Sequence, residues 1–170
     1  MTKVISFILF IVISSISFGQ DIEELERRNG FKDLKLGSPI DSIKGAEFRK
    51  EVKEKGEFPA KLWEIENDNY KSIGEVKVKS VEVKTYKDLI YEIVVITNKD
   101  TRLMKGMTKS FGQPKYILVT DSYNWVAHTL GLTFKDHSKH EIKLTYKSYP
   151  VIKMMYADKG KKIDEIAEDF

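Results

Sequence analysis

Apolar and polar residues alternate with a period of two over most of the chain from Leu62 onward. That alternation is typical of strands that bury one face, and a nearly unbroken apolar run over 90–96 predicts a central strand. Val78 and Val81 are separated by an odd number of positions, so a bulge or tight turn near Ser80 is needed to keep both valines on one face. The predicted strands are 62–65, 76–84, 90–96, 116–120, 123–128, 130–134, 142–146 and 151–156, with turns at 86–89 and 136–139.

The clearest helix is predicted over 98–111, where the large apolar residues fall on one face at helical spacing. Asn98 or Asp100 can cap its start, because a short polar side chain can accept a hydrogen bond from a free backbone N–H. Gly112 and Pro114 together predict its end.

Three other segments have weaker helical signals. Ser38 as a cap and Pro39 at the first helical position predict a short helix over 38–45. Residues 46–56 are dense in Lys and Glu with few apolar anchors, which predicts either a second helical stretch or a mobile loop. Apolar residues recur at helical spacing over 163–170 and predict a short amphipathic helix.

Together these elements predict an α+β fold, in which short helices pack on an antiparallel β-sheet. The chain divides into a predicted signal peptide at 1–19, a charged leader at 20–30, and two stretches at 31–97 and 98–170 that form one compact unit. The length of 170 residues fits a single domain.

An internal repeat is an open alternative. Trp63 and Trp125 lie 62 residues apart, and at that offset the predicted helices and several predicted strands superpose. The same offset places 91–96 on 153–158. In that case each half consists of a helical segment followed by about four antiparallel strands.

The N-terminus has the pattern of a secretory signal peptide. A positive start at Lys3 is followed by an uncharged run over 4–18, and small residues precede Gln20. The alternative is a membrane anchor, but the run is shorter than the roughly 20 residues that cross a bilayer core. We therefore expect a periplasmic or secreted protein that does not span the membrane after signal cleavage.

Charge and composition narrow the function classes. The chain has 29 Lys and Arg against 26 Asp and Glu, so it has no strongly basic balance and we expect no nucleic-acid partner. It has no cysteine, which excludes disulfides, thiol catalysis, cysteine-based zinc sites and N-terminal lipidation on cysteine. A hydrophobic content of 41% is enough for a real core.

Two short motifs resemble a known group. The stretch LGSPIDSI at 36–43 resembles the opening of proteins with the β-lactamase-inhibitory-protein-like fold, a group that includes the small lipoprotein of the outer-membrane assembly machine. FGQP at 111–114, followed by YNW at 123–125, resembles a second part of the same group's pattern, in which glycine-x-proline precedes a strand that contains tryptophan. The resemblance implies helices on an antiparallel sheet, used for protein binding rather than catalysis. The lipidation cysteine of the lipoprotein members is missing here, so membrane tethering does not carry over, and no binding residue can be transferred.

The sequence has three histidines, and His137 and His140 are its most metal-like feature. They are candidates for a metal site, because imidazole groups in one turn can converge on zinc or copper, but a polar hairpin tip that happens to hold two histidines is the favoured interpretation. His128 would need a nucleophile and an orienting carboxylate to act as a base, and no such motif surrounds it. We therefore predict no metal site, no cofactor and no catalytic set.

The chain is rich in tyrosine and tryptophan, which dominate protein interfaces and are also favoured in strands. Tyr86, Tyr146 and Tyr149 are predicted to be the most exposed and are the candidates for a binding face. The resulting expectation is a non-catalytic protein-binding protein of the bacterial envelope, with an unknown envelope protein as its partner. The alternatives are a periplasmic carrier of a small ligand, or a hydrolase whose site forms only in three dimensions.

Overall fold

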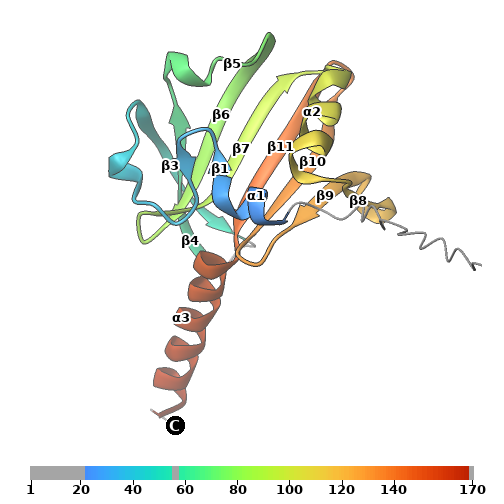
Figure 1. Cartoon of the computed structure of the whole chain (residues 1–170). Coiled ribbons are helices and arrows are strands. Elements are labelled where there is room, and N and C mark those ends of the chain that lie inside the picture. The colour runs from blue at the N-terminus through green and yellow to red at the C-terminus, as the bar shows by residue number, and fades with distance from the viewer. Residues whose placement is uncertain (1–21, 55–57, 169–170) are drawn as a thin grey trace, which may run out of the picture.

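One antiparallel sheet forms the body of the protein (Figure 1). The computed structural model describes residues 22–54 and 58–168. Across the sheet the strands run in the order β3-β4-β6-β7-β11-β10-β9-β8, and the short strand β5 pairs with β6. These strands are β3 (Ala46–Glu54), β4 (Phe58–Ile65), β6 (Val76–Tyr86), β7 (Leu89–Asn98), β8 (Lys115–Ile117), β9 (Ser122–Val126), β10 (Leu130–Ser138) and β11 (Glu141–Ser148).

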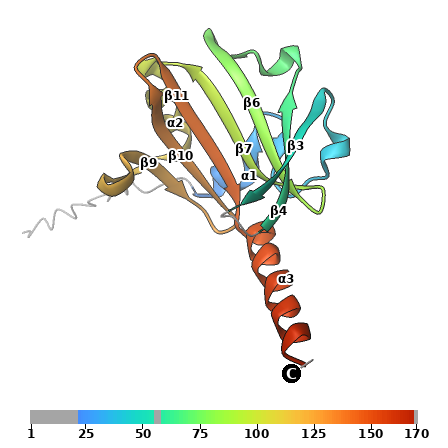
Figure 2. The same ribbon diagram turned by 180° about the vertical axis from the view of Figure 1, so that it is seen from behind.

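Two helices and a small hairpin cover one face of this sheet, and Figure 2 shows the opposite face from behind. Leu25, Phe31 and Leu103 from the covering elements pack on Val83 and Ile93 of the sheet in one continuous core. This arrangement confirms the predicted α+β fold. The remaining elements are α1 (Ile22–Arg28), β1 (Gly30–Phe31), β2 (Leu34–Lys35), the 3₁₀ turns η1 (Ile40–Ser42), η2 (Asp68–Tyr70) and η3 (Leu118–Thr120), β5 (Ser72–Ile73), α2 (Thr101–Phe111) and α3 (Tyr149–Glu168).

The hairpin of β6 and β7 forms as the valine spacing predicts. Its register shifts between Val78 and Ser80, so Val78 and Val81 are both buried despite their odd separation. The turn between the strands is Lys87-Asp88, and both residues have positive φ, at 48° and 61°. Two consecutive residues with positive φ are the geometry of the tight hairpin turn that matches strand twist.

The strand order is symmetric about its centre. β3, β4, β6 and β7 lie on one side, β11, β10, β9 and β8 lie on the other, and the two sets meet where β7 pairs with β11. This symmetric order is the one expected of two similar halves. The prediction that a constant offset of 62 residues relates the two halves is wrong. Residues 153–158 lie in α3, and the counterpart of β7 in the second half is β11.

The predicted helix before the second set of strands is confirmed as α2. It begins at Thr101 because Asp100 caps it, with the Asp100 side chain accepting a hydrogen bond from the Arg102 backbone N–H at 2.8 Å. It ends at Gly112, whose φ of 72° lies in the region that favours glycine.

The two earlier helical predictions are wrong. Residues 38–45 form only the 3₁₀ turn η1, because the Ser38 hydroxyl donates to the Lys35 carbonyl at 2.7 Å and does not cap the segment. Residues 46–56, predicted as a helix or a mobile loop, form strand β3 as far as Glu54. β3 is the outer strand of the sheet, and most of its side chains are exposed, so it needs few apolar anchors.

The predicted final strand at 151–156 is also wrong, because these residues belong to α3. Ser148 precedes the helix and its hydroxyl accepts a hydrogen bond from the Val151 backbone N–H at 3.4 Å, which caps the first turn. Pro150 is compatible with a first turn, because its missing N–H has no helical partner there. Of the predicted helix at 163–170, the described residues as far as Glu168 form the end of this longer helix, which projects away from the sheet (Figures 1 and 2).

The two tryptophans differ in how much stability they supply. Trp125 is fully buried, packs edge-on against Phe111 and donates from Nε1 to the Gly112 carbonyl at 2.8 Å. Trp63 is only half-buried and donates to the Thr85 hydroxyl at 3.0 Å. We predict that Trp125→Ala lowers the free energy of unfolding by about 4 kcal/mol and Trp63→Ala by about half as much. Urea unfolding measures both, and equal losses would contradict the difference in burial.

Candidate functional site

The predicted histidine site does not converge. His137 and His140 are both exposed at the β10–β11 hairpin, and the described residues contain no group of three metal-ligating side chains. His128 is exposed too. The Glu26 carboxylate of α1 lies near His128. It accepts hydrogen bonds from the Thr129 backbone N–H at 2.7 Å and from the Thr129 hydroxyl. Glu26 therefore ties α1 to the turn between β9 and β10.

The expectation that three tyrosines are exposed is wrong for two of them. Tyr146 is buried in β11, in phase with Ile142 and Leu144. Tyr86 is buried because α3 covers its end of the open face, where Tyr86 packs in a small core with Val151 and Met155, and its hydroxyl donates to Asp158 of α3 at 2.9 Å. Tyr149 is exposed as predicted, at 38%, and its role in binding stays a prediction.

Near α3, the open face of the sheet carries a network of alternating charges. Lys84 lies 2.9 Å from Glu54 and 3.0 Å from Glu92, and Lys147 lies 3.0 Å from the other oxygen of Glu92. The Tyr91 hydroxyl also donates to Glu54 at 3.0 Å. The Glu92 side chain is only 7% exposed, so the two lysines supply the opposite charge that burial requires.

The pKa shifts of Glu54 and Lys84 favour their charged forms. Burial raises the pKa of Glu54, but the hydrogen bond and charge of Lys84 outweigh burial and hold that pKa below its usual value of 4.5. Burial lowers the pKa of Lys84, yet its two carboxylate partners raise the pKa above the usual value. Since Glu54 and Lys84 hold each other in the charged form, this pair suits a structural role better than proton transfer.

A different region has the features of an interaction surface. The chain turns back through η3 between β8 and β9. Two apolar or aromatic side chains of β8, two of η3 and one of β9 are exposed there, and together they are here called the apolar tip. Leu118 is 80% exposed and Val119 is 96% exposed. The members of the apolar tip are Tyr116, Ile117, Leu118, Val119 and Tyr123.

Local contacts hold the apolar tip in shape. The rings of Tyr116 and Tyr123 lie 5.0 Å apart across the β8–β9 pair. Asp121 adopts a left-handed conformation at the end of η3 and accepts a hydrogen bond from the Tyr116 hydroxyl at 2.7 Å. Leu118 and Val119 thus project from a fixed turn, although apolar side chains of this size usually gain about 1.5–3 kcal/mol each on burial.

The two outer strands of the sheet differ in chemistry. β3 carries mostly alternating acidic and basic residues, and such charges on an edge strand oppose pairing with another chain. β8 reads Lys115-Tyr116-Ile117, pairs with β9 on one side and has no described strand on the other. The edge at β8 therefore lacks the charged protection that β3 has, and it adjoins the apolar tip.

No protein-family model, curated protein or solved structure matches this chain. Among the described residues, no helix is long and apolar enough to cross a membrane. The predicted signal peptide at 1–19 lies outside the described residues. The candidate site therefore rests on its geometry.

Removing the shared cation of the charge network should destabilise the fold. Lys84→Met leaves Glu54 without its ion pair and Glu92 with Lys147 alone, and we expect the free energy of unfolding to fall by about 3 kcal/mol. The matched control is Lys61→Met, which breaks an exposed pair with Asp88 and should change the free energy of unfolding far less, because solvent screens that pair. Urea unfolding followed by tryptophan fluorescence measures both, and equal effects would show that burial of the network is unimportant.

Acidification should remove the contribution of Glu54. Because its pKa is lower in the folded state than in the unfolded chain, its contribution is complete above pH 4.5 and is lost as the pH falls through the lower folded value. We therefore expect Glu54→Gln to be less stable than the wild type at neutral pH and the difference to shrink below pH 4.5. A difference in unfolding free energy that stays constant down to about pH 3 would contradict the lowered pKa.

Proposed function

We propose that this chain is a non-catalytic binding protein that docks on a protein partner through the apolar tip and the adjoining edge of β8. The observation that carries the proposal is the exposure of Leu118 and Val119 at 80% and 96% on a turn held by its own contacts. Contiguous exposed apolar residues of this kind mark interaction sites, whereas single ones are ordinary.

The backbone of β8 favours a protein over a lipid bilayer as the partner. An outer strand presents N–H and C=O groups that need hydrogen-bond partners, and hydrocarbon offers none. A strand or loop of another protein can pair with these groups while its side chains cover Leu118 and Val119. The two exposed tyrosines beside them can add contact area and hydrogen bonds at the rim of such an interface.

Two expectations from the sequence support the same function. The resemblance to the β-lactamase-inhibitory-protein-like group implies protein binding, and the predicted signal peptide at 1–19 implies an envelope location. We therefore place the proposed partner among proteins of the bacterial envelope.

Site-specific photo-crosslinking in the cell of origin tests the proposal. With a photoreactive residue at Lys115, we expect a discrete protein adduct, and Leu118→Asp with Val119→Asp should reduce it about 100-fold, because two apolar side chains lose their burial in the interface. Ile163→Asp with Ile166→Asp is the matched control, since these residues of α3 are also exposed, at 55% and 60%. The control should leave the adduct unchanged.

Three outcomes would count against protein docking at the apolar tip. They are the absence of a protein adduct, adducts with lipid alone, and adducts that survive the Leu118 and Val119 substitutions. Both double variants change exposed residues, so their melting temperatures should stay close to that of the wild type, and this separates lost binding from lost folding.

A further inference from the structure

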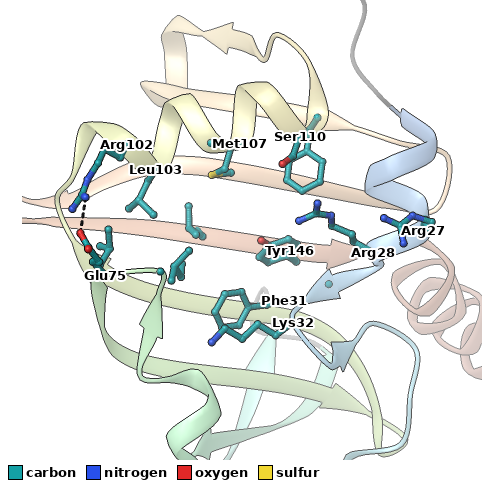
Figure 3. A pocket seen from close by; sticks show the side chains of 17 residues that line it. Arg27, Arg28, Phe31, Lys32, Glu75, Arg102, Leu103, Met107, Ser110 and Tyr146 are labelled. Carbon is teal, nitrogen blue, oxygen red and sulfur yellow. Dashed lines mark hydrogen bonds and ion pairs between the residues drawn. The ribbon is translucent and has the colours of Figure 1, made fainter.

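A second candidate binding region lies on the covered face of the sheet, beneath α2. A cavity of about 700 Å³ opens between α2, α1, the β1 strand and the β5–β6 hairpin, and β11 forms part of its floor (Figure 3). It is here called the α2 cavity. Its volume falls within the range of about 300–1,000 Å³ that is typical of small-molecule sites, and it far exceeds the voids left in an ordinary core.

The middle of the α2 cavity is apolar. Leu103 and Met107 line it from α2, Val76 and Ile73 line it from the β5–β6 hairpin, and Leu144 lines it from β11. An alkyl chain can therefore lie along it and lose contact with water, at a gain of about 0.8 kcal/mol for each CH₂ group.

Positive charge is unevenly distributed at the two ends of the α2 cavity. At one end, Arg102 pairs with Glu75 at 2.8 Å and with Asp100 at 2.9 Å, so its charge is neutralised. At the other end lie Arg28 and Arg27 of α1, and Lys32 lies beside Phe31 along the rim (Figure 3).

Those cations are only partly neutralised. Arg27 and Arg28 both bind the single carboxylate of Glu24, and Lys32 donates to the backbone carbonyl of Asn69 rather than to an acid. The α1 end of the cavity thus favours a negative charge.

Tyr146 adds a directed hydrogen-bond donor at this same end. Its ring is buried and its hydroxyl lies in the cavity lining, where no described side chain forms a hydrogen bond with it. Burial raises the pKa of Tyr146, and the nearby positive charge of Arg28 opposes this only in part, so the hydroxyl keeps its proton at neutral pH. A protonated phenol beside a guanidinium is a good donor pair for a carboxylate oxygen.

A glycine keeps the mouth of the α2 cavity open. Gly106 lies in the middle of α2, where glycine costs about 1 kcal/mol relative to alanine. It lines the cavity, and a Cβ atom built on it would meet no atom within 4 Å, so no neighbouring group demands glycine for packing. A large side chain at this position would extend into the space that the cavity leaves free.

We propose that the α2 cavity binds a single-chain amphiphile with a carboxylate head, such as a fatty acid. Its carboxylate accepts hydrogen bonds from Tyr146 and Arg28, and its alkyl chain lies between α2 and the β5–β6 hairpin, towards Leu103. This site is separate from the apolar tip, and the proposal stands or falls independently of the protein partner.

Isothermal titration calorimetry with dodecanoate, below its micelle concentration, tests the proposal on the purified protein. We expect one dodecanoate to bind for each chain, at least tenfold more tightly than dodecanol, which has the same chain without the carboxylate. Arg28→Gln and Tyr146→Phe should each reduce this preference several-fold while leaving the binding of dodecanol nearly unchanged. Lys105→Gln is the matched control, because it removes an exposed cation from α2 that does not line the cavity.

Gly106→Leu tests the place of binding. It should weaken both dodecanoate and dodecanol at least tenfold and raise the melting temperature, because leucine is a better helix former than glycine. Gly106→Ala should raise the melting temperature with little loss of binding, which separates blockage from helix stability. No binding of dodecanoate, equal affinity for the two molecules, or full binding to a folded Gly106→Leu variant would each overturn the proposal.

Discussion

The pairing of β7 with β11 is the constraint on which the rest of the structure depends. It joins the last strand of the first set of four to the last strand of the second set, in a continuous register from Asn98 with Glu141 to Glu92 with Lys147. On the covered face this pair presents Ile93, Val95 and Leu144 to the helices, and all three are buried. The four strands of each side then extend the sheet outward, so its outer strands are β3 and β8.

The same central pair governs both faces of the sheet. Its covered side supplies the floor of the α2 cavity through Leu144 and Tyr146, while its open side holds Glu92 between Lys84 and Lys147. Apolar burial on one face and compensated charge on the other fix the register, because a slip by one residue would exchange the two sets. The apolar tip lies away from this centre, beside an outer strand, whereas the α2 cavity lies directly over β11 of the central pair.

Much of the fold could be predicted from the sequence where one physical signal was strong. The valine spacing predicted the bulge at Ser80, and Asp100 with Gly112 bounded α2. The prediction failed at β3, because an outer strand with two exposed faces has no apolar period to detect. It failed again at 151–156, where a last strand after Pro150 is predicted although Ser148 and Pro150 carry a helix-start signal.

The candidate sites were harder to predict, for a similar reason. Tyr146 was expected to be exposed, although it stands two residues after Leu144 in the buried phase of its strand, so the signal was present. For Leu118 and Val119 there was no such signal. Both residues lie within the strand predicted over 116–120. In the structure they belong to η3 instead, and the turn of the chain there exposes their side chains. The α2 cavity joins residues from α1, β5, α2 and β11, and no local pattern can bring these together.

The projection of α3 has a consequence for local unfolding of the protein. Its first turns are held by Val151 and Met155 in a small core and by Asp158, which bonds Tyr86 and lies 2.6 Å from Lys87. Residues 161–168 are all exposed, so their helical state rests on a local equilibrium that is marginal in water. Backbone amides of this distal part should therefore exchange with solvent far faster than those of β7 and β11, through openings that leave the sheet intact. Loss of helical circular dichroism on heating would begin before the buried Trp125 changes its fluorescence, so the two signals would report two different transitions.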